Sequence, residues 1–97
     1  MLEKTNAPDC FKVGMNRLDV YTTPILESEM ALIFQKDITR LYLDFSEVEE
    51  VSSSVLGLLL HKKMFYKKMG KELCITNVLP PISKLLKILN LSNHLLT

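Results

Sequence analysis

The sequence has no excess of charge of either sign, which narrows the partners that it is built to bind. Its 97 residues include 12 Lys and Arg against 11 Asp and Glu, a formal net charge of +1. Proteins that bind the phosphate backbone of nucleic acids normally carry a clear basic excess. We therefore expect no direct nucleic-acid partner, and near-neutrality favours protein partners.

Cysteine and histidine are scarce, which argues against a metal centre. Cys10 and Cys74 lie inside apolar stretches, and their spacing matches no metal or redox motif. His61 and His94 have no nearby cysteine to complete a ligand set, so we expect both at the surface. The sequence predicts two free thiols that behave as small hydrophobic groups, with no metal and no cofactor.

Long apolar runs are also missing. The longest, Val55–Leu60, ends at a histidine and two lysines, far short of the roughly 20 residues of a membrane-spanning helix. Residues 1–6 lack the long apolar region of a secretion signal. Together with free thiols, which suit a reducing compartment, these features predict a cytoplasmic protein with no membrane insertion.

The sequence lacks the residue combinations that catalysis needs. It has three glycines in all and no glycine-rich phosphate loop. The triplet Ser52-Ser53-Ser54 is not flanked by the glycines of a nucleophile elbow, and no histidine is placed by the pattern as its base. We predict a protein that is not an enzyme.

The patterns that are present describe one α/β domain over residues 1–97. Hydrophobic residues make up 47% of the chain, enough for one modest core, and no linker or repeat interrupts it. Alternation and apolar runs predict a bend or strand end at 18–20 and strands at 10–15, 39–45, 73–75 and 94–97. We expect the 39–45 strand at the centre of the sheet.

Helical spacing predicts two helices in the first two thirds of the chain. The first opens with a capping hydroxyl from Thr23 and with Pro24 in the first helical position, and it ends near Lys36. The second runs from the three serines to Met69, where Gly70 stops it.

A third helix is predicted after Pro80 and Pro81, with Asn90 as its left-handed cap. Apolar residues at helical spacing are expected in the core; they are Leu26, Met30, Ile33 and Phe34 in the first helix, Met64 and Phe65 in the second, and Ile82, Leu85, Leu86 and Leu89 in the third.

The junction between the 39–45 strand and the second helix carries an ordered set of polar and small residues. In chain order these are Asp44, Ser53, Ser54, Leu56 and Gly57, then 68–71 before the next strand, and Asn77 and Val78 after it. In this order they resemble the signature of STAS domains, and in particular of anti-sigma factor antagonists. The resemblance covers about the last two thirds of the chain and, more weakly, residues 18–23.

The resemblance implies a mixed four- to five-stranded sheet with helices packed on it. It also implies that Ser53 occupies the position that an anti-sigma factor serine kinase phosphorylates. The partner-binding residues implied around it are Asp19, Thr22, Ser52, Ser54, Val55 and Asn77. The implied partners are that kinase and a serine phosphatase, and the implied role is regulation of bacterial transcription. The oligomeric state stays open.

The chemistry of a helix start agrees with this expectation. Unpaired backbone N–H groups and a partial positive charge suit either a capping hydroxyl or a phosphate. A phosphate on Ser53 would add about −1.5 to −2 charges beside Glu47, Glu49 and Glu50. An apolar or acidic partner would then be repelled.

Two positions differ from the family pattern and leave other interpretations open. Ser52 stands where the family has an acidic residue, and Val55 where it has a glycine. From residue types alone, Ser52 caps the helix and the next two serines are solvated first-turn residues. The change at Ser52 favours a non-phosphorylated structural STAS subunit, as in lipid-transport ATPase complexes. A module of a spatial or stress-signalling complex is a third possibility.

A basic cluster follows the apolar half of the second helix. It comprises Lys62, Lys63, Lys67, Lys68 and Lys71. Such a run is usually the solvated face of a helix, and it also has the charge to attract a phosphate or an acidic partner.

Overall fold

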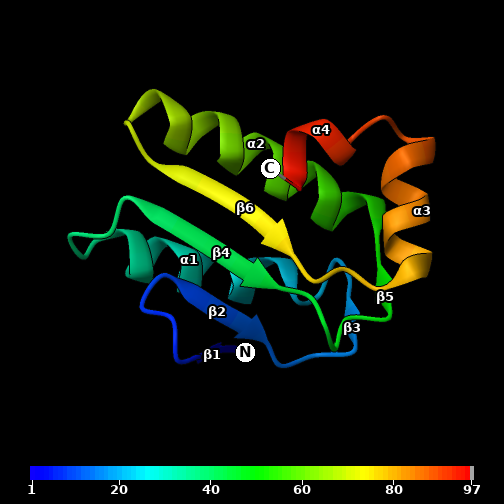
Figure 1. Ribbon diagram of the computed structural model, residues 1–97, viewed down its shortest axis with the longest axis horizontal. Coiled ribbons are helices and arrows are strands. Elements are labelled where there is room, and N and C mark those ends of the chain that lie inside the picture. The colour runs from blue at the N-terminus through cyan, green and yellow to red at the C-terminus, as the bar shows by residue number, and fades with distance from the viewer. Residues whose placement is uncertain (97) are drawn as a thin grey trace.

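Four short strands with alternating buried residues form the main sheet. In the computed structural model, which describes residues 1–96, they lie in the order β1 (Leu2–Lys4), β2 (Cys10–Val13), β4 (Arg40–Asp44) and β6 (Glu72–Thr76) (Figure 1). β2, β4 and β6 are parallel, and β1 pairs with β2 in the antiparallel sense. The mixed sheet and the central place of β4 are confirmed, whereas β1 has no counterpart among the predicted strands.

Helices connect the parallel strands and cover one face of the sheet. α1 (Thr23–Phe34) comes between β2 and β4 in the chain, and α2 (Ser53–Lys68) between β4 and β6. Parallel neighbours need crossovers of this kind. In Figure 1, α1 passes behind β2 and β4. The buried strand residues on the covered face are Phe11, Val13, Leu41, Leu43, Leu73 and Ile75.

A second, two-stranded parallel sheet lies beside the first. It consists of β3 (Arg17–Leu18) and β5 (Glu50–Val51), which pair residue for residue. The bend at 18–20 was expected, but the polar segment 46–51 was not expected to form a strand. The pairing ties the chain just before α2 to the chain just before α1.

The start of α1 corrects the predicted cap. The helix begins at Thr23, so Pro24 is its second residue, and Thr22 at the cap position makes no side-chain cap hydrogen bond. The Thr23 hydroxyl donates to the carbonyl of Asp19 at 3.0 Å, so it closes the preceding turn instead of capping the helix. α1 ends at Phe34, two residues before the predicted end.

The predicted ends of the other two long helices are confirmed. Gly70 follows α2 with φ +76°, and Asn90 follows α3 (Pro80–Ile88) with φ +57°. Both values lie in the left-handed region that ends helices. In α3, Ile82 and Leu86 are buried as predicted and Leu85 is partly buried. The prediction that Leu89 lies in the core is wrong, because this residue follows the last turn of the helix and is 46% exposed.

Two predictions about the core are wrong at α2. Met64 is 59% exposed and Phe65 is 48% exposed. The helix turns the side that carries Val55, Leu59 and Tyr66 to the core instead. The side chain of Tyr66 is therefore in the core, where Met64 and Phe65 were expected. Its ring packs against the ring of Phe34, with centroids 4.1 Å apart.

The predicted closing strand is also wrong. Ser92–Leu95 form a short helix, α4, in which the N–H groups of His94 and Leu95 donate to the carbonyl of Leu91 at 3.0 Å. The left-handed turn at Asn90 sends the chain back over the core, where Leu95 is buried. Thr97 lies outside the described residues.

Candidate partner-docking site

The first turns of α1 and α2 lie at the end of the sheet where the parallel strands finish. The β3–β5 pairing is extended by a hydrogen bond from the Ser52 N–H to the Leu18 carbonyl at 2.9 Å. This contact brings the serine triplet next to the loop that begins at Asp19. Asn77 follows β6 at the same edge of the sheet, exposed and with φ +56°. In open α/β sheets, this edge is where binding sites form.

The three serines have different roles. Ser52 is the cap residue of α2, and its Oγ accepts from the Val55 N–H at 3.4 Å and lies 2.8 Å from the Ser54 Oγ. Ser53 is exposed, and within residues 1–96 its hydroxyl makes no hydrogen bond to another residue. Ser53 therefore presents an uncommitted hydroxyl at the start of a helix, while its two neighbours are held by each other.

Asp19 and Thr22 form a closed turn before α1. The Asp19 carboxylate accepts from the N–H groups of Tyr21 and Thr22 at 2.9 and 3.2 Å. The Thr22 hydroxyl in turn accepts from the Asp19 N–H at 2.9 Å and donates to its carbonyl at 3.0 Å. Both side chains thus shape this loop, and they fix the path of the two residues between them.

The arrangement of strands and helices matches known proteins. A family model described as "Mlab, STAS domain" matches residues 17–97. The chain belongs to the STAS domain family. Its fold is also similar to that of the anti-sigma factor antagonist SpoIIAA in its unphosphorylated form, with a TM-score of 0.77 and 17% identity, over 99% of this chain and 84% of that one. Identity this low shows the shared fold alone. A comparison with curated proteins gives no match.

The STAS resemblance and the predicted α/β class are therefore confirmed, but one predicted surface residue is not at the surface. Val55 is 0% exposed, because the third position of α2 points into the core. Its side chain anchors the first turn of α2 from within. Of the partner-binding residues expected for this STAS domain, Ser54 and Asn77 are exposed, and Asp19, Thr22 and Ser52 are partly buried.

Exposed apolar residues next to the site were missed by the sequence reasoning. Val20 is 58% exposed and Tyr21 is 84% exposed, and Ile25, in the first turn of α1, has half of its surface in solvent. Their signal in the sequence is weak: two large apolar residues in a turn, outside any helical or strand period. Exposed aromatic and aliphatic side chains of this kind are typical anchors of protein interfaces.

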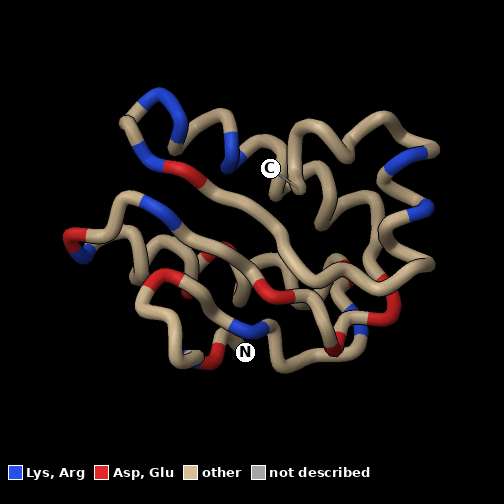
Figure 2. Tube along the Cα trace, viewed as in Figure 1, with Lys and Arg blue, Asp and Glu red and all other residues tan. Residues whose placement is uncertain are grey.

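The charges near the site are mostly acidic and partly paired. Glu47 forms an ion pair with Lys12 at 3.0 Å, and Glu50 one with Arg17 at 2.9 Å. The hydrogen bond from Lys12 to Glu47 is the main cause that raises the pKa of Lys12. Figure 2 shows acidic segments around β3 and β5, away from the C-terminal end of α2, with basic segments of α3 at the same end of the molecule.

The histidines and cysteines singled out in the sequence lie away from the serine triplet. His61 and His94 are exposed as expected, and both cysteines are free thiols. Burial is the main cause that raises the pKa of the Cys74 thiol, which keeps it protonated near neutral pH. Over the described part of the chain there is no group of three or more His, Cys, Asp or Glu side chains that could hold a metal ion, and no helix with the length and apolar character to cross a membrane.

Proposed function

We propose that this STAS domain is a partner-switching module that docks on a kinase-type anti-sigma factor while Ser53 is unphosphorylated. The observation that carries the proposal is the uncommitted, exposed hydroxyl of Ser53 at the start of α2, between two serines that hydrogen-bond each other. Docking would release a sigma factor for transcription, and phosphorylation of Ser53 by the partner would end the interaction. In this role the domain acts by binding, and the proposal assigns it no catalytic residue.

The docking surface has both an apolar and a polar part. Val20, Tyr21 and Ile25 are exposed beside the start of α2 and supply apolar anchors. Ser54 and Asn77 supply hydrogen-bonding groups around them. Desolvated anchors of this type provide most of the binding free energy of an interface, and the surrounding polar groups set its specificity.

Phosphorylation would act on this surface through charge. A phosphate adds about −1.5 to −2 charges, and the N-terminus of α2 stabilises that charge in the free domain. Glu49 and Glu50 precede Ser53 by four and three positions and add charge of the same sign. An apolar partner surface would have to desolvate the phosphate, so the complex would weaken. A serine phosphatase would restore binding.

A second candidate function is a structural STAS subunit of a transporter ATPase that is not phosphorylated. Two observations favour it. Ser52 stands where the family signature has an acidic residue, and its hydroxyl is used as a helix cap, so the local structure is explained without a kinase. The description of the matching family model also names Mlab and not an antagonist.

Capture of partners from native lysate separates the two functions. Tagged wild type, Ser53→Ala and the neighbouring control Ser54→Ala are compared, and both the partners and the serine peptide are identified by mass spectrometry. We expect a kinase-type anti-sigma factor on all three and phosphate on Ser53 of wild type and Ser54→Ala alone. An ATPase subunit held equally by all three, without phosphate, contradicts the switch and supports the structural subunit.

A further inference from the structure

A polar cavity lies at the opposite end of α2 from Ser53. Its volume is about 440 Å³, and it is bordered by the last turns of α2, the turn into β6 and the short helix α4. Charged and polar side chains dominate its wall: Lys63, Lys67, Lys71, Glu72, Asn93 and His94. Figure 2 shows the lysines gathered around this corner.

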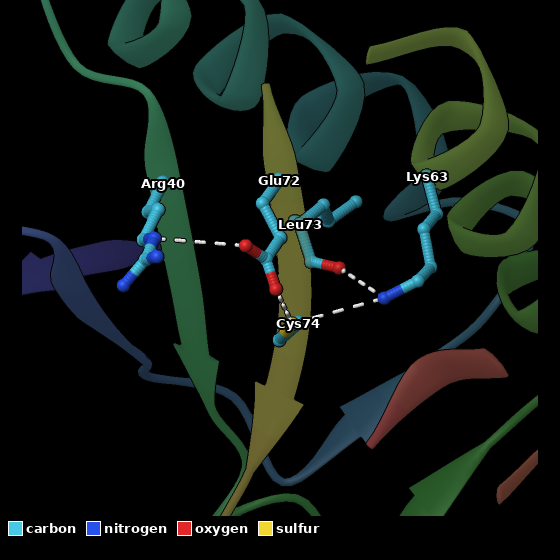
Figure 3. A network of polar contacts seen from close by, with 5 residues as sticks. All are labelled: Arg40, Lys63, Glu72, Leu73 and Cys74. Atoms are coloured by element: carbon cyan, nitrogen blue, oxygen red, sulfur yellow. Dashed lines mark hydrogen bonds and ion pairs between the residues drawn. The ribbon is translucent and has the colours of Figure 1, made fainter. Parts of the chain in front are cut away.

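Positive charge dominates the cavity because its one carboxylate is already engaged. Glu72 Oε2 lies 3.6 Å from Arg40 Nε across the sheet, and its Oε1 accepts from the Cys74 thiol at 3.5 Å (Figure 3). Arg40 does not border the cavity. The cavity therefore has three lysines and one acid, Glu72, and the negative charge of Glu72 is already balanced by Arg40.

Two of the lysines are held in place by backbone oxygens. Lys63 Nζ donates to the Leu73 carbonyl at 2.8 Å, on the edge of β6 that no other strand pairs with (Figure 3). Lys71 Nζ donates to the Phe34 carbonyl and lies 5.5 Å above the Phe34 ring. These ammonium groups provide positive charge at fixed positions. Binding of an anion therefore costs little side-chain conformational entropy at these two lysines.

Lys67 and His94 are the side chains that can turn toward a ligand. Both are exposed, and neither side chain forms an ion pair or hydrogen bond with another residue of the described chain. The helix end nearby does not oppose an anion strongly, because its last carbonyls are used: Tyr66 O accepts from Met69 and Lys71 N–H, and Lys67 O from Gly70 N–H.

We propose that this cavity binds a small phosphorylated molecule, with its phosphate held by Lys67 and His94 in the field of Lys63 and Lys71. The cavity has three positive lysines and one acid that is already paired. A phosphate with two negative charges balances this excess of positive charge better than a ligand with one carboxylate. Lysine ammonium groups bind phosphate as point charges, and the cavity falls in the size range of small-molecule sites, about 300–1,000 Å³. The proposal does not depend on the role of Ser53.

The test is a titration of the ¹⁵N-labelled chain with inorganic phosphate, at ionic strength held constant with sodium chloride. We expect saturable shifts of the Gly70, Lys71 and Leu73 amides. Lys67→Gln should raise the half-saturating concentration about five- to tenfold, because it removes one charge-assisted contact. Lys68→Gln is the matched control: the same charge is lost from the next residue of the helix, outside the cavity, and the change should stay below about twofold.

His94→Gln and AMP complete the test. The histidine variant should weaken phosphate binding without altering the fold, since His94 is exposed. AMP should bind at least as tightly as phosphate, because the cavity has room for the rest of the molecule. Linear shifts that sodium chloride reproduces, an equal loss in Lys68→Gln, or failure of AMP to bind would each overturn the proposal. Lys63 is not substituted, because its hydrogen bond to the Leu73 carbonyl on the edge of β6 would be lost and the fold could change.

Discussion

At the scale of single residues, three consecutive serines carry out three different tasks. The sequence could predict Ser52 as a cap, because serine before an apolar helical run is a strong start signal. It could not predict that Ser54 pairs with Ser52 and leaves Ser53 unengaged, since this depends on side-chain orientation in the folded turn. Nor could it show that Val55 points inward, because that follows from how α2 rotates against the sheet.

The different roles of the serines predict different effects on stability. Ser52→Ala removes the cap and should lower the free energy of unfolding by about 0.5–1 kcal/mol, the low end for caps because the bond is long. Ser53→Ala should change it by less than about 0.5 kcal/mol, as expected at an exposed position. Urea unfolding measures both. Equal losses from the two variants would contradict the assignment of Ser52 as the cap.

At the scale of elements, the helices and strands that could be predicted from the sequence are those whose apolar residues recur with a clear period. α1, α2, α3, β4 and β6 were found because their apolar residues recur at helical or strand spacing over several residues. β5 was missed because a two-residue strand in a polar segment has no period. α4 was taken for a strand because His94 is followed by two leucines, and only the left-handed turn at Asn90 reveals that the chain folds back there.

Replacing Gly57, inside α2, and Gly70, just after it, by alanine should change the free energy of unfolding in opposite directions. Gly70 has φ +76° and open space around it, so Gly70→Ala costs only the strained backbone, about 1–2 kcal/mol. Gly57 lies inside α2, also with open space, and Gly57→Ala should stabilise the fold by about 0.5–1 kcal/mol. Thermal and urea unfolding of both variants test this. Destabilisation by Gly57→Ala would show that α2 is packed more closely than described.

At the scale of the whole molecule, the two ends of α2 border surfaces of different composition. The end where the parallel strands finish carries the serines, the exposed side chains of Val20, Tyr21 and Ile25, and the acids Glu49 and Glu50. The opposite corner, between α2 and β6, carries the polar cavity with Lys63, Lys67 and Lys71. The sequence already showed the run of lysines, but only the folded chain brings Lys63, Lys67 and Lys71 together with α4 around one cavity. The two proposals thus place a protein partner at one end of α2 and a small phosphorylated ligand at the other.

The most direct test of the switch compares the affinity of the captured anti-sigma factor for the unphosphorylated domain and for the domain with phosphoserine built in at position 53. We predict that the phosphate weakens binding about a hundredfold or more, since a buried, uncompensated charge costs several kcal/mol at an interface. Phosphoserine at position 54 serves as the neighbouring control. Equal affinities for the unphosphorylated and Ser53-phosphorylated domains would contradict the proposed switch.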